Sequence, residues 1–483
     1  MKFPYISPLE RRPLRKVAAL FCTAMLGVMA ACGGSSSPAP IPTVGSTAVQ
    51  VNLGDGPADW MLAFSMNVTS MSLTGSNGSV NVTNTATPME MLHRLGTMEP
   101  MALISAPQGT YTGATMTIAA CNVTYLDPTT KALVQKTIQG PFNATIPFGS
   151  NVTLGTTPLA FNFDLDLENS VSMDGSGNLQ FSPKFQISTG TQTAAGNNGN
   201  SARNGGMQQM MGVVNSSSAN SFSMTPLQAI NAFTFTVNSA TQFQGQISNM
   251  AMMGTGMGVL VSAILQPDGS LLATRVRANM KAGGIMGGGI ITSVTGLPGQ
   301  PATQLTLVMQ NGAGASMMSS YLSQTITVNL TAQTSYEVDD DRIDLAKLPF
   351  TPVFNATNIY AGQSVLPTST SGMMTSGMSG MSSGTITASD VSLQEQGFRG
   401  TNDLAITPGA SGTFVLSLVP GCAFATLIGA SPTDVVKITV YQLTGTNVES
   451  STAIPANSTV RVHGLLFKNA GQWTLIASTI AAS

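Results

Sequence analysis

The stretch Leu159-Ala-Phe-Asn-Phe-Asp-Leu-Asp-Leu-Glu168 decides the fold class of this chain. Apolar and polar side chains alternate along it, and successive residues of a β-strand point to opposite faces of a sheet. A helix would scatter the same residues around its circumference. The stretch therefore predicts a half-buried strand with one apolar face and one polar face, the latter carrying Asp164, Asp166 and Glu168.

The same two-residue period extends outward from this strand. The segment Asp174–Asn178 predicts a turn into further strand residues at Leu179–Phe185. Residues Leu62–Val68 also alternate, and Met71 and Leu73 continue with the opposite parity, which predicts a β-bulge. Only 8% of the 483 residues are charged, and Gly, Ser, Thr, Asn and Val dominate, which disfavours long surface helices. We predict an all-β protein.

The first residues predict export and a lipid anchor. A basic segment at Arg11–Lys16 precedes the apolar run Val17–Ala30, and a small-residue stretch then ends at Cys32. This order resembles a bacterial lipoprotein signal, which implies cleavage before Cys32 and acylation of its thiol. The run of about 14 residues is shorter than the ~20 that span a membrane, so an uncleaved anchor is the weaker alternative. Gly33 rather than aspartate follows the cysteine, so we expect the outer membrane of the cell envelope.

The remaining cysteines do not predict a disulfide framework. Cys22 falls in the expected signal and Cys32 is the expected anchor, which leaves Cys121 and Cys422 in the exported part. These two lie about 300 positions apart, and a bridge would need their Cα atoms within about 7 Å. We expect two separate buried thiols, with a disulfide as the alternative.

Four motifs follow the anchor: Val51-Asn-Leu-Gly-Asp-Gly-Pro-Ala-Asp59, Pro107-Gln-Gly-Thr-Tyr111, Phe161 to Ser170 and Phe181-Ser-Pro-Lys-Phe185. Together they resemble a domain-of-unknown-function family, DUF4382, of bacterial lipoproteins. The resemblance implies a β-sandwich and no enzymatic residue. The usual Asp-Ala-Pro of the family is Asp55-Gly-Pro57 in this chain.

The second half contains a weak repeat, and repeats indicate an architecture of similar units. Three similar strand-and-turn successions begin at Val237, Val328 and Val436. They resemble the DUF5666 family, which implies small closed β-barrels, and the second copy carries a Gly/Ser/Met insertion at Pro367–Gly384. The expected organisation is a signal peptide at 1–31, a flexible tether at 32–46, a β-sandwich at 47–188, a linker at 189–210, and barrel-like modules at 211–280, 285–396 and 397–483.

No catalytic signature is found. A Ser-His-Asp arrangement needs a histidine base, and the sequence has only His93 and His463, without a G-x-S-x-G motif. We expect both histidines to pack on the surface or on a strand face, and we assign neither a catalytic residue nor a cofactor. The chain is predicted not to be an enzyme.

Three acidic segments are candidate sites. Alternate strand residues lie about 6.6 Å apart, so Asp164, Asp166 and Glu168 could serve glycoside cleavage or cation binding. A solvated sheet face is the preferred interpretation. Glu337 with Asp339, Asp340 and Asp341, and likewise Asp174–Asn178, lack EF-hand spacing, so we expect solvated turns and no metal site.

Methionine is unusually frequent, with 29 residues. Thioethers can bind Cu(I), which makes copper handling the alternative function, but we favour flexible loops with apolar contacts. The tracts comprise Met207, Met210 and Met211, then Met250, Met252, Met253 and Met257, then Met373, Met374, Met378 and Met381.

The net charge of −2 predicts that no nucleic acid is bound. The leading hypothesis is a non-enzymatic envelope module that binds a glycan or an envelope protein, or acts as a structural spacer, and that is held in the membrane by lipid on Cys32. Aromatic residues would supply stacking surfaces for a glycan. Only Trp60 and Trp473 are present as tryptophan, which weakens the glycan case.

Overall fold

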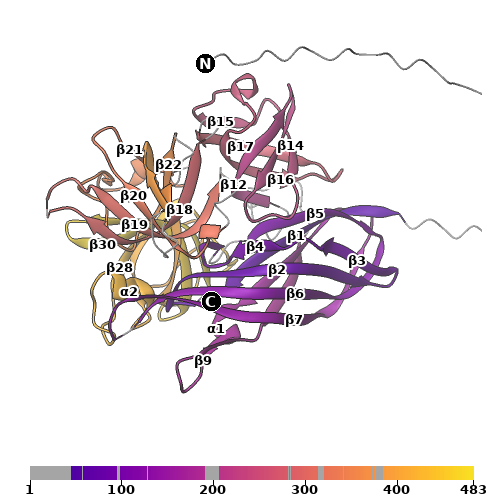
Figure 1. Ribbon diagram of the computed structural model, residues 1–483, viewed down its shortest axis with the longest axis horizontal. Coiled ribbons are helices and arrows are strands. Elements are labelled where there is room, and N and C mark those ends of the chain that lie inside the picture. Colours follow the sequence, from indigo (N-terminus) through magenta and orange to yellow (C-terminus); the bar gives the residue numbers. More distant parts are fainter. Residues whose placement is uncertain are drawn as a thin grey trace, which may run out of the picture. The chain divides into compact units, whose positions relative to one another are not determined.

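The computed structural model describes residues 45–482 apart from 57, 95–97, 128, 191–205, 281, 283, 298, 314–319, 341, 371–374 and 377–383. The predicted all-β class is confirmed, because strands dominate the described chain (Figure 1). The expected signal and Cys32 lie outside the described residues. Within the described part, no helix has the length and apolar character required to cross a membrane. Residues 44–483 form one compact unit.

The N-terminal part is a sandwich of two sheets. The first sheet has the order β11 (Phe185–Gly190), β8 (Leu159–Asp166), β1 (Ser46–Gly56) and β5 (Met98–Pro107), with β1 parallel to β8. The second contains β3 (Gly78–Thr83), β2 (Met61–Gly75), β6 (Gly109–Leu126) and β7 (Leu133–Leu154), and β4 (Thr87–Glu90) also pairs with β2. Short elements beside them are η1 (Leu92–Arg94), α1 (Leu167–Ser170), β9 (Val171–Met173) and β10 (Leu179–Phe181).

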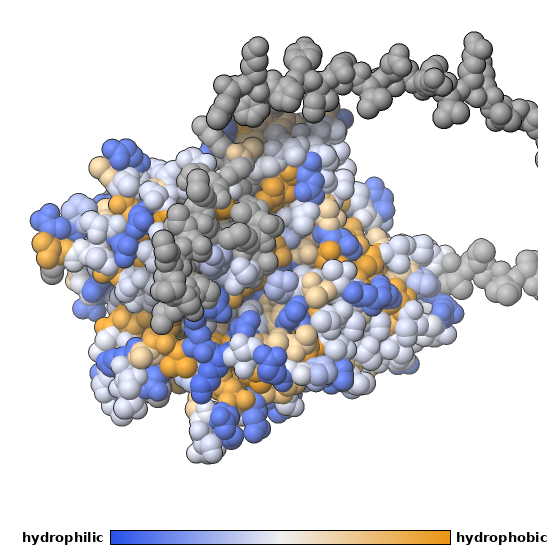
Figure 2. All heavy atoms as spheres, in the orientation of Figure 1, coloured by the Kyte–Doolittle hydropathy of each residue, from blue (hydrophilic) through white to orange (hydrophobic). Residues whose placement is uncertain are grey.

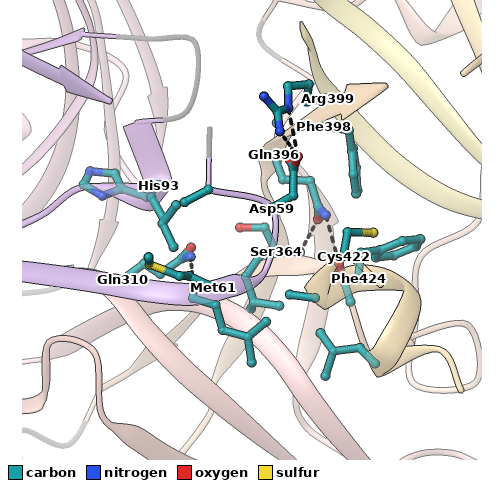
Figure 3. A pocket seen from close by; sticks show the side chains of 18 of the residues that line it. Asp59, Met61, His93, Gln310, Ser364, Gln396, Phe398, Arg399, Cys422 and Phe424 are labelled. Carbon is teal, nitrogen blue, oxygen red and sulfur yellow. Dashed lines mark hydrogen bonds and ion pairs between the residues drawn. The ribbon is translucent and has the colours of Figure 1, made fainter. Parts of the chain in front are cut away.

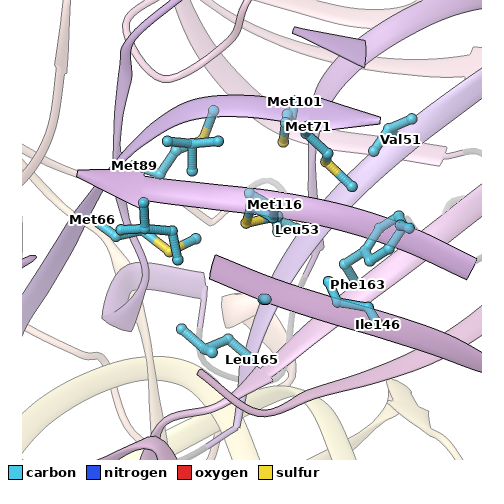
Figure 4. Close-up of a cluster of buried hydrophobic side chains, with 14 of the residues drawn as sticks. Val51, Leu53, Met66, Met71, Met89, Met101, Met116, Ile146, Phe163 and Leu165 are labelled. Atoms are coloured by element: carbon cyan, nitrogen blue, oxygen red, sulfur yellow. The ribbon is translucent and has the colours of Figure 1, made fainter. Parts of the chain in front are cut away.

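Methionine fills much of the space between these two sheets (Figure 4). Unbranched thioether side chains adapt to irregular gaps, which suits a core between two twisted sheets. The six that are at most 1% exposed are Met66, Met71, Met89, Met91, Met101 and Met116. They pack against the apolar face of β8, where Phe161, Phe163 and Leu165 are fully buried.

The opposite face of β8 differs from the prediction. Asn162 is 1% exposed, and its Oδ1 accepts a hydrogen bond from Nδ2 of Asn52. Oδ1 of Asn52 accepts a hydrogen bond from Nε2 of Gln50 at 2.8 Å. A row of buried amides therefore crosses the sheet where a solvated face was expected. The strand also ends at Asp166, so Glu168 lies on the helical turn α1 rather than on the strand. The predicted β-bulge is confirmed, since the β2–β6 register shifts between Val68 and Ser70.

The chain then forms a first barrel. Its sheet has the order β14 (Phe233–Thr236), β13 (Ser221–Pro226), β12 (Gly206–Ser217), β16 (Gly258–Leu265), β17 (Leu271–Met280) and β15 (Gln242–Gly245), with η3 (Met250–Met252) on a connection. An additional parallel pairing of β14 with β17 closes the ring. Because β11 continues to Gly190 and β12 begins at Gly206, the predicted linker is shorter than 189–210.

The second sheet of this half has eight strands, and η5 (Leu345–Lys347) lies between two of them. Their order is β21 (Ser335–Val338), β25 (Asp390–Leu393), β22 (Ser364–Ser369), β18 (Ile285–Thr295), β19 (Gln304–Ala313), β20 (Thr325–Asn329), β24 (Gly384–Thr387) and β23 (Thr375–Ser376). Consecutive strands β24 and β25 pair with β20 and β22 respectively, so together they close this ring.

The last sheet is a closed five-stranded barrel, drawn in yellow in Figure 1. Its order is β26 (Glu395–Asn402), β27 (Gly412–Leu418), β28 (Lys437–Val448), β30 (Gln472–Ala482) and β29 (Thr459–Asn469), with α2 (Ala423–Leu427) between β27 and β28. When β15, β21 and β23 are left aside and β24 and β25 are counted as one strand, the strands of all three rings run in the order 1-2-3-5-4 and return to strand 1. This is the order of an OB-type Greek-key barrel.

Each barrel has a glycine in its first strand where the second strand comes too close for a Cβ atom. The first strand bends sharply because it pairs with both the second and the fourth, and glycine permits the approach. The distances from an added Cβ to the facing carbonyl oxygen are 2.9 Å for Gly212 and Thr225, 2.0 Å for Gly289 and Val308, and 2.5 Å for Gly400 and Ser417.

The sandwich and the barrels are joined by buried hydrogen bonds, rather than being separate modules on linkers. Gln228 of the first barrel donates to the Gln310 carbonyl of the second barrel at 3.0 Å, and Gln310 donates to Leu62 of the sandwich at 2.7 Å. Gln363 of the second barrel donates to Leu466 of the third at 2.9 Å. Buried amides whose partners lie in another module favour a single arrangement of the modules, because separation would leave those groups without a protein partner.

Candidate functional site

A cavity lies where the sandwich meets the second and third barrels (Figure 3). We call it the junction cavity; it consists of two neighbouring pockets of about 120 and 100 Å³, which we call its lobes. Four residues line both lobes: His93, Gln310, Ser364 and Glu395. The first lobe is the more apolar, with Phe398 and Phe424 in its wall, and the second also contains Arg342 and His463.

His93 is held between two carboxylates. It lies on η1, with Nδ1 2.7 Å from Oε2 of Glu90 and Nε2 2.9 Å from Oε1 of Glu99. Glu90 is fully buried and also accepts the backbone N–H groups of Phe64 and His93 at 3.0 Å. The expected surface packing of His93 is therefore wrong, because sandwich carboxylates occupy both ring nitrogens.

Glu395, the first residue of β26, is the centre of a second network. Its carboxylate accepts from Nε of Arg342 at 3.0 Å, from Nδ1 of His463 at 2.9 Å, and from the hydroxyl of Ser478. Burial by itself would raise the pKa of Glu395, but the charge of Arg342 and the bonds from His463 and Ser478 outweigh it and lower the pKa to about 2. Glu395 is thus an anion at neutral pH, and its bonds to Arg342 and His463 join two barrels.

A third network closes the first lobe. Asp59 of the sandwich accepts from Nε of Arg399 in β26 at 2.8 Å, and Nη1 of Arg399 reaches Glu168 at 2.7 Å. Burial raises the pKa of Asp59, and the charge of Arg399 partly offsets that rise. The Asp59 carbonyl accepts from the N–H of Ala423 at 2.7 Å, so α2 is fixed to the same strand end.

Three polar atoms of the cavity wall make no hydrogen bond within the described part of the chain: Oγ of Ser364, Oε1 of Gln310 and Nε2 of His463. Carboxylates only accept, so Nδ1 of His463 carries the hydrogen in its bond to Glu395 and Nε2 is the nitrogen left open. The cavity therefore offers hydrogen-bonding groups that the protein itself does not use.

The predicted acidic sites have other roles. Asp166 accepts from the Asn169 N–H and caps α1, whereas Glu168 pairs with Arg399. Asp174 accepts from the N–H groups of Ser176 and Asn178 at 2.9 Å, which is the predicted turn.

The predicted solvated turn at Glu337–Asp341 is wrong for Asp339. That residue is 1% exposed and pairs with Arg277 of the first barrel at 3.1 Å, as Glu337 does at 2.8 Å. Asp341 lies outside the described residues. Among those that are described, no three His, Cys, Asp or Glu side chains are grouped to hold a metal ion.

The other singled-out residues belong mainly to cores. Met207, Met210 and Met211 lie buried on β12 instead of in a flexible loop, and Met253 is also buried, whereas Met252 is 51% exposed. The tract Met373, Met374, Met378 and Met381 falls outside the described residues. Cys121 and Cys422 are separate buried free thiols.

The two tryptophans are both half-buried. Trp60 meets Tyr125 edge-on with ring centroids 5.4 Å apart, and Trp473 packs on Phe424 at 5.1 Å. The Nζ atom of Lys468 lies 5.4 Å from the centre of the Trp473 ring. Neither ring is a bare platform for stacking.

Sequence reasoning missed Glu395, Arg342 and Arg399 as site residues. The available signal was the scarcity of charge: where 8% of residues are charged, a charged side chain on an alternating strand calls for a partner.

On the face drawn in Figure 2, orange hydrophobic and blue hydrophilic residues are interspersed among many pale residues of intermediate hydropathy.

Comparison with known proteins adds little to this description of the site. Curated proteins yield no match. A deletion mutant of the single-stranded DNA-binding protein from Thermus aquaticus is a matching solved structure, with 12% identity, a TM-score of 0.14, and coverage of 41% of this chain and 93% of that one. The prediction that no nucleic acid is bound is thereby corrected as too strong. It rested on charge alone, whereas single strands are also bound by stacking on aromatic rings. At this TM-score the likeness carries no argument for a shared activity.

One family model matches part of the chain. Residues 211–277, which contain most of the first barrel, match DUF5666, a domain of unknown function. The expected resemblance of the repeats to that family is therefore supported for this stretch.

Proposed function

We propose that this chain is a lipid-anchored protein of the bacterial envelope, placed in the outer membrane, that binds a ligand in the junction cavity without transforming it. The observation that carries the proposal is the convergence of both histidines of the protein, from the sandwich and the third barrel, on one cavity whose wall keeps unused hydrogen-bonding groups. Ligand sites commonly lie at such junctions between domains.

The charged groups around the cavity favour binding over catalysis. General acid–base catalysis works best with a pKa near the operating pH. Glu395 has a pKa of about 2 and is engaged by Arg342, while both nitrogens of His93 contact carboxylates. These paired groups hold the cavity wall in place and preserve its shape.

The anchor is tested by fractionation of cells that express the full chain or its Cys32→Ala variant. We expect the wild-type chain in the membrane fraction with the added mass of acyl chains, and the variant without that mass and released or retained by its signal alone. An unmodified Cys32 in the wild-type chain would refute the anchor.

Binding is tested by thermal shift and calorimetry with neutral hexoses, free amino acids and trialanine. The cavity-blocking variant is Gly288→Val, because a Cβ at Gly288 would lie 3.4 Å from Leu366 and 3.6 Å from Val365, both in the wall of the second lobe. Gly149→Val is the matched control, since nothing lies within 4 Å of its added Cβ. We expect at least one ligand class to stabilise wild type and the control but not Gly288→Val. Lack of any such ligand would refute the proposed site.

A further inference from the structure

From the unused groups of the junction cavity we infer the class of its ligand: a single neutral sugar ring. This inference rests on the proposed function and narrows it. Three observations carry it, namely the pairing of the charges at the cavity, the chemistry of the groups left open, and the division of the cavity into an apolar and a polar lobe.

The charged groups that border the cavity already contact partners within the protein. Asp59 pairs with Arg399, Glu395 with Arg342 and His463, and His93 with Glu90 and Glu99. An ammonium or carboxylate ligand would have to compete with these pairs for a counter-charge, whereas an uncharged ligand leaves them intact. The ligand that we infer is therefore uncharged.

The open groups match hydroxyls. Oε1 of Gln310 accepts, and so does Nε2 of His463 when its hydrogen is on Nδ1, whereas Oγ of Ser364 can donate or accept. A hydroxyl also both donates and accepts, so adjacent hydroxyls of one molecule can satisfy all three. Ser364 and Gln310 line both lobes, so these bonds would form where the lobes adjoin.

The first lobe suits the body of a sugar ring. The rings of Phe398 and Phe424, whose centroids are 5.1 Å apart, contribute aromatic surface to its wall. A pyranose has apolar C–H faces and a polar rim, so a face can pack on aromatic surface while the rim reaches the polar groups. Cavities of about 150 Å³ hold a benzene ring. Each lobe, of about 120 or 100 Å³, is smaller than that, so a ligand with one substituted ring would extend through both lobes.

The test is calorimetric titration of the full chain in detergent with D-glucose, D-galactose and D-mannose, with glucosamine and glucuronate as the cationic and anionic counterparts. We expect at least one neutral hexose to bind more tightly than its charged counterparts. Ser364→Ala should weaken that hexose by about fivefold, the value of one hydrogen bond. Ser364 lacks a side-chain partner in the described chain, so this variant should fold normally. Ser293→Ala, an exposed serine on β18, is the matched control and should leave affinity unchanged.

The outcomes separate the two proposals. Tighter binding of the charged sugars, or hexose binding that Ser364→Ala and Gly288→Val both leave intact, would overturn the sugar site. Binding of amino acids or trialanine in the cavity, with none of the hexoses, would overturn the inference but preserve the proposed function. Absence of every ligand would overturn both.

Discussion

Arg399 of the third barrel donates from Nε to Oδ2 of Asp59 in the sandwich over 2.8 Å, although 340 positions of the chain separate them. The same guanidinium reaches Glu168. Arg399 is 18% exposed and Asp59 14%, so the bond between them is shielded from solvent. This contact holds the end of the chain against its beginning and closes one side of the junction cavity.

Replacement of Arg399 should loosen that junction. Arg399→Met keeps the length of the side chain but leaves Asp59 largely buried without its cation, and breaking such pairs is costly. We expect a loss of about 2 kcal/mol in the free energy of unfolding, measured by urea titration. Lys347→Met is the control, since Lys347 and Asp344 are each 54% exposed and such surface pairs contribute little. Equal effects of the two variants would contradict the role of Arg399.

The contribution of Glu395 to the free energy of unfolding should fall at acid pH. Its pKa is lowered to about 2 in the folded chain from 4.5, so its contribution is fully present above pH 4.5 and is lost as the pH falls towards 2. Glu395→Gln should cost about 3 kcal/mol at pH 7 and progressively less between pH 4.5 and 2. Urea titrations at pH 7, 4.5 and 3 measure the difference. The exposed Glu449→Gln should show none, and a pH-independent cost for Glu395→Gln would count against this account.

The contribution of Asp390 to the free energy of unfolding should have the opposite pH dependence. Burial, and then the charge of Glu337, raise its pKa to about 6. A raised pKa stabilises the fold below the unfolded value of 3.8, and this stability is lost as the pH rises through 6. Asp390→Asn should therefore stabilise the chain at pH 8 by about 1 kcal/mol, after a discount for solvent screening, and by less at pH 5. The melting temperatures of both proteins at the two pH values test this; a gain that does not grow with pH would argue against it.

The first-strand glycines should be intolerant of any side chain. A Cβ at Gly289 would lie 2.0 Å from the Val308 carbonyl oxygen, and a backbone atom cannot move aside without distortion of the strand. We expect Gly289→Ala to cost at least about 3 kcal/mol, which is large for an added methyl group. Gly149→Ala is the control, because its Cβ meets nothing within 4 Å. Circular dichroism with thermal melts would measure both, and similar melting temperatures would show that the barrel adapts.

The sequence was most informative about strands. The alternation at Phe161, Phe163 and Leu165 predicted a strand, and all three side chains are fully buried. It was least informative about the polar positions between them. Asn162 looked like a solvated residue but belongs to a buried row of amides. Its partner Asn52 lies 110 positions away, and no local pattern specifies such a pairing.

The contacts of the candidate site were even less predictable from the sequence than the row of buried amides. Lone histidines without nearby motifs gave no reason to connect His93 with His463, yet the two line the same lobe of the cavity. Likewise, the sequence around Glu395 does not indicate that Arg342, His463 and Ser478 surround its carboxylate.

By itself, the sequence determined which residues form strands and which face of each strand is apolar, because side-chain direction alternates locally along an extended chain. Only the tertiary structure decided what covers the polar faces and which charges meet. Those choices depend on contacts between residues far apart in the chain, where burial makes a polar or charged side chain stable only beside a partner that the neighbouring sequence does not supply.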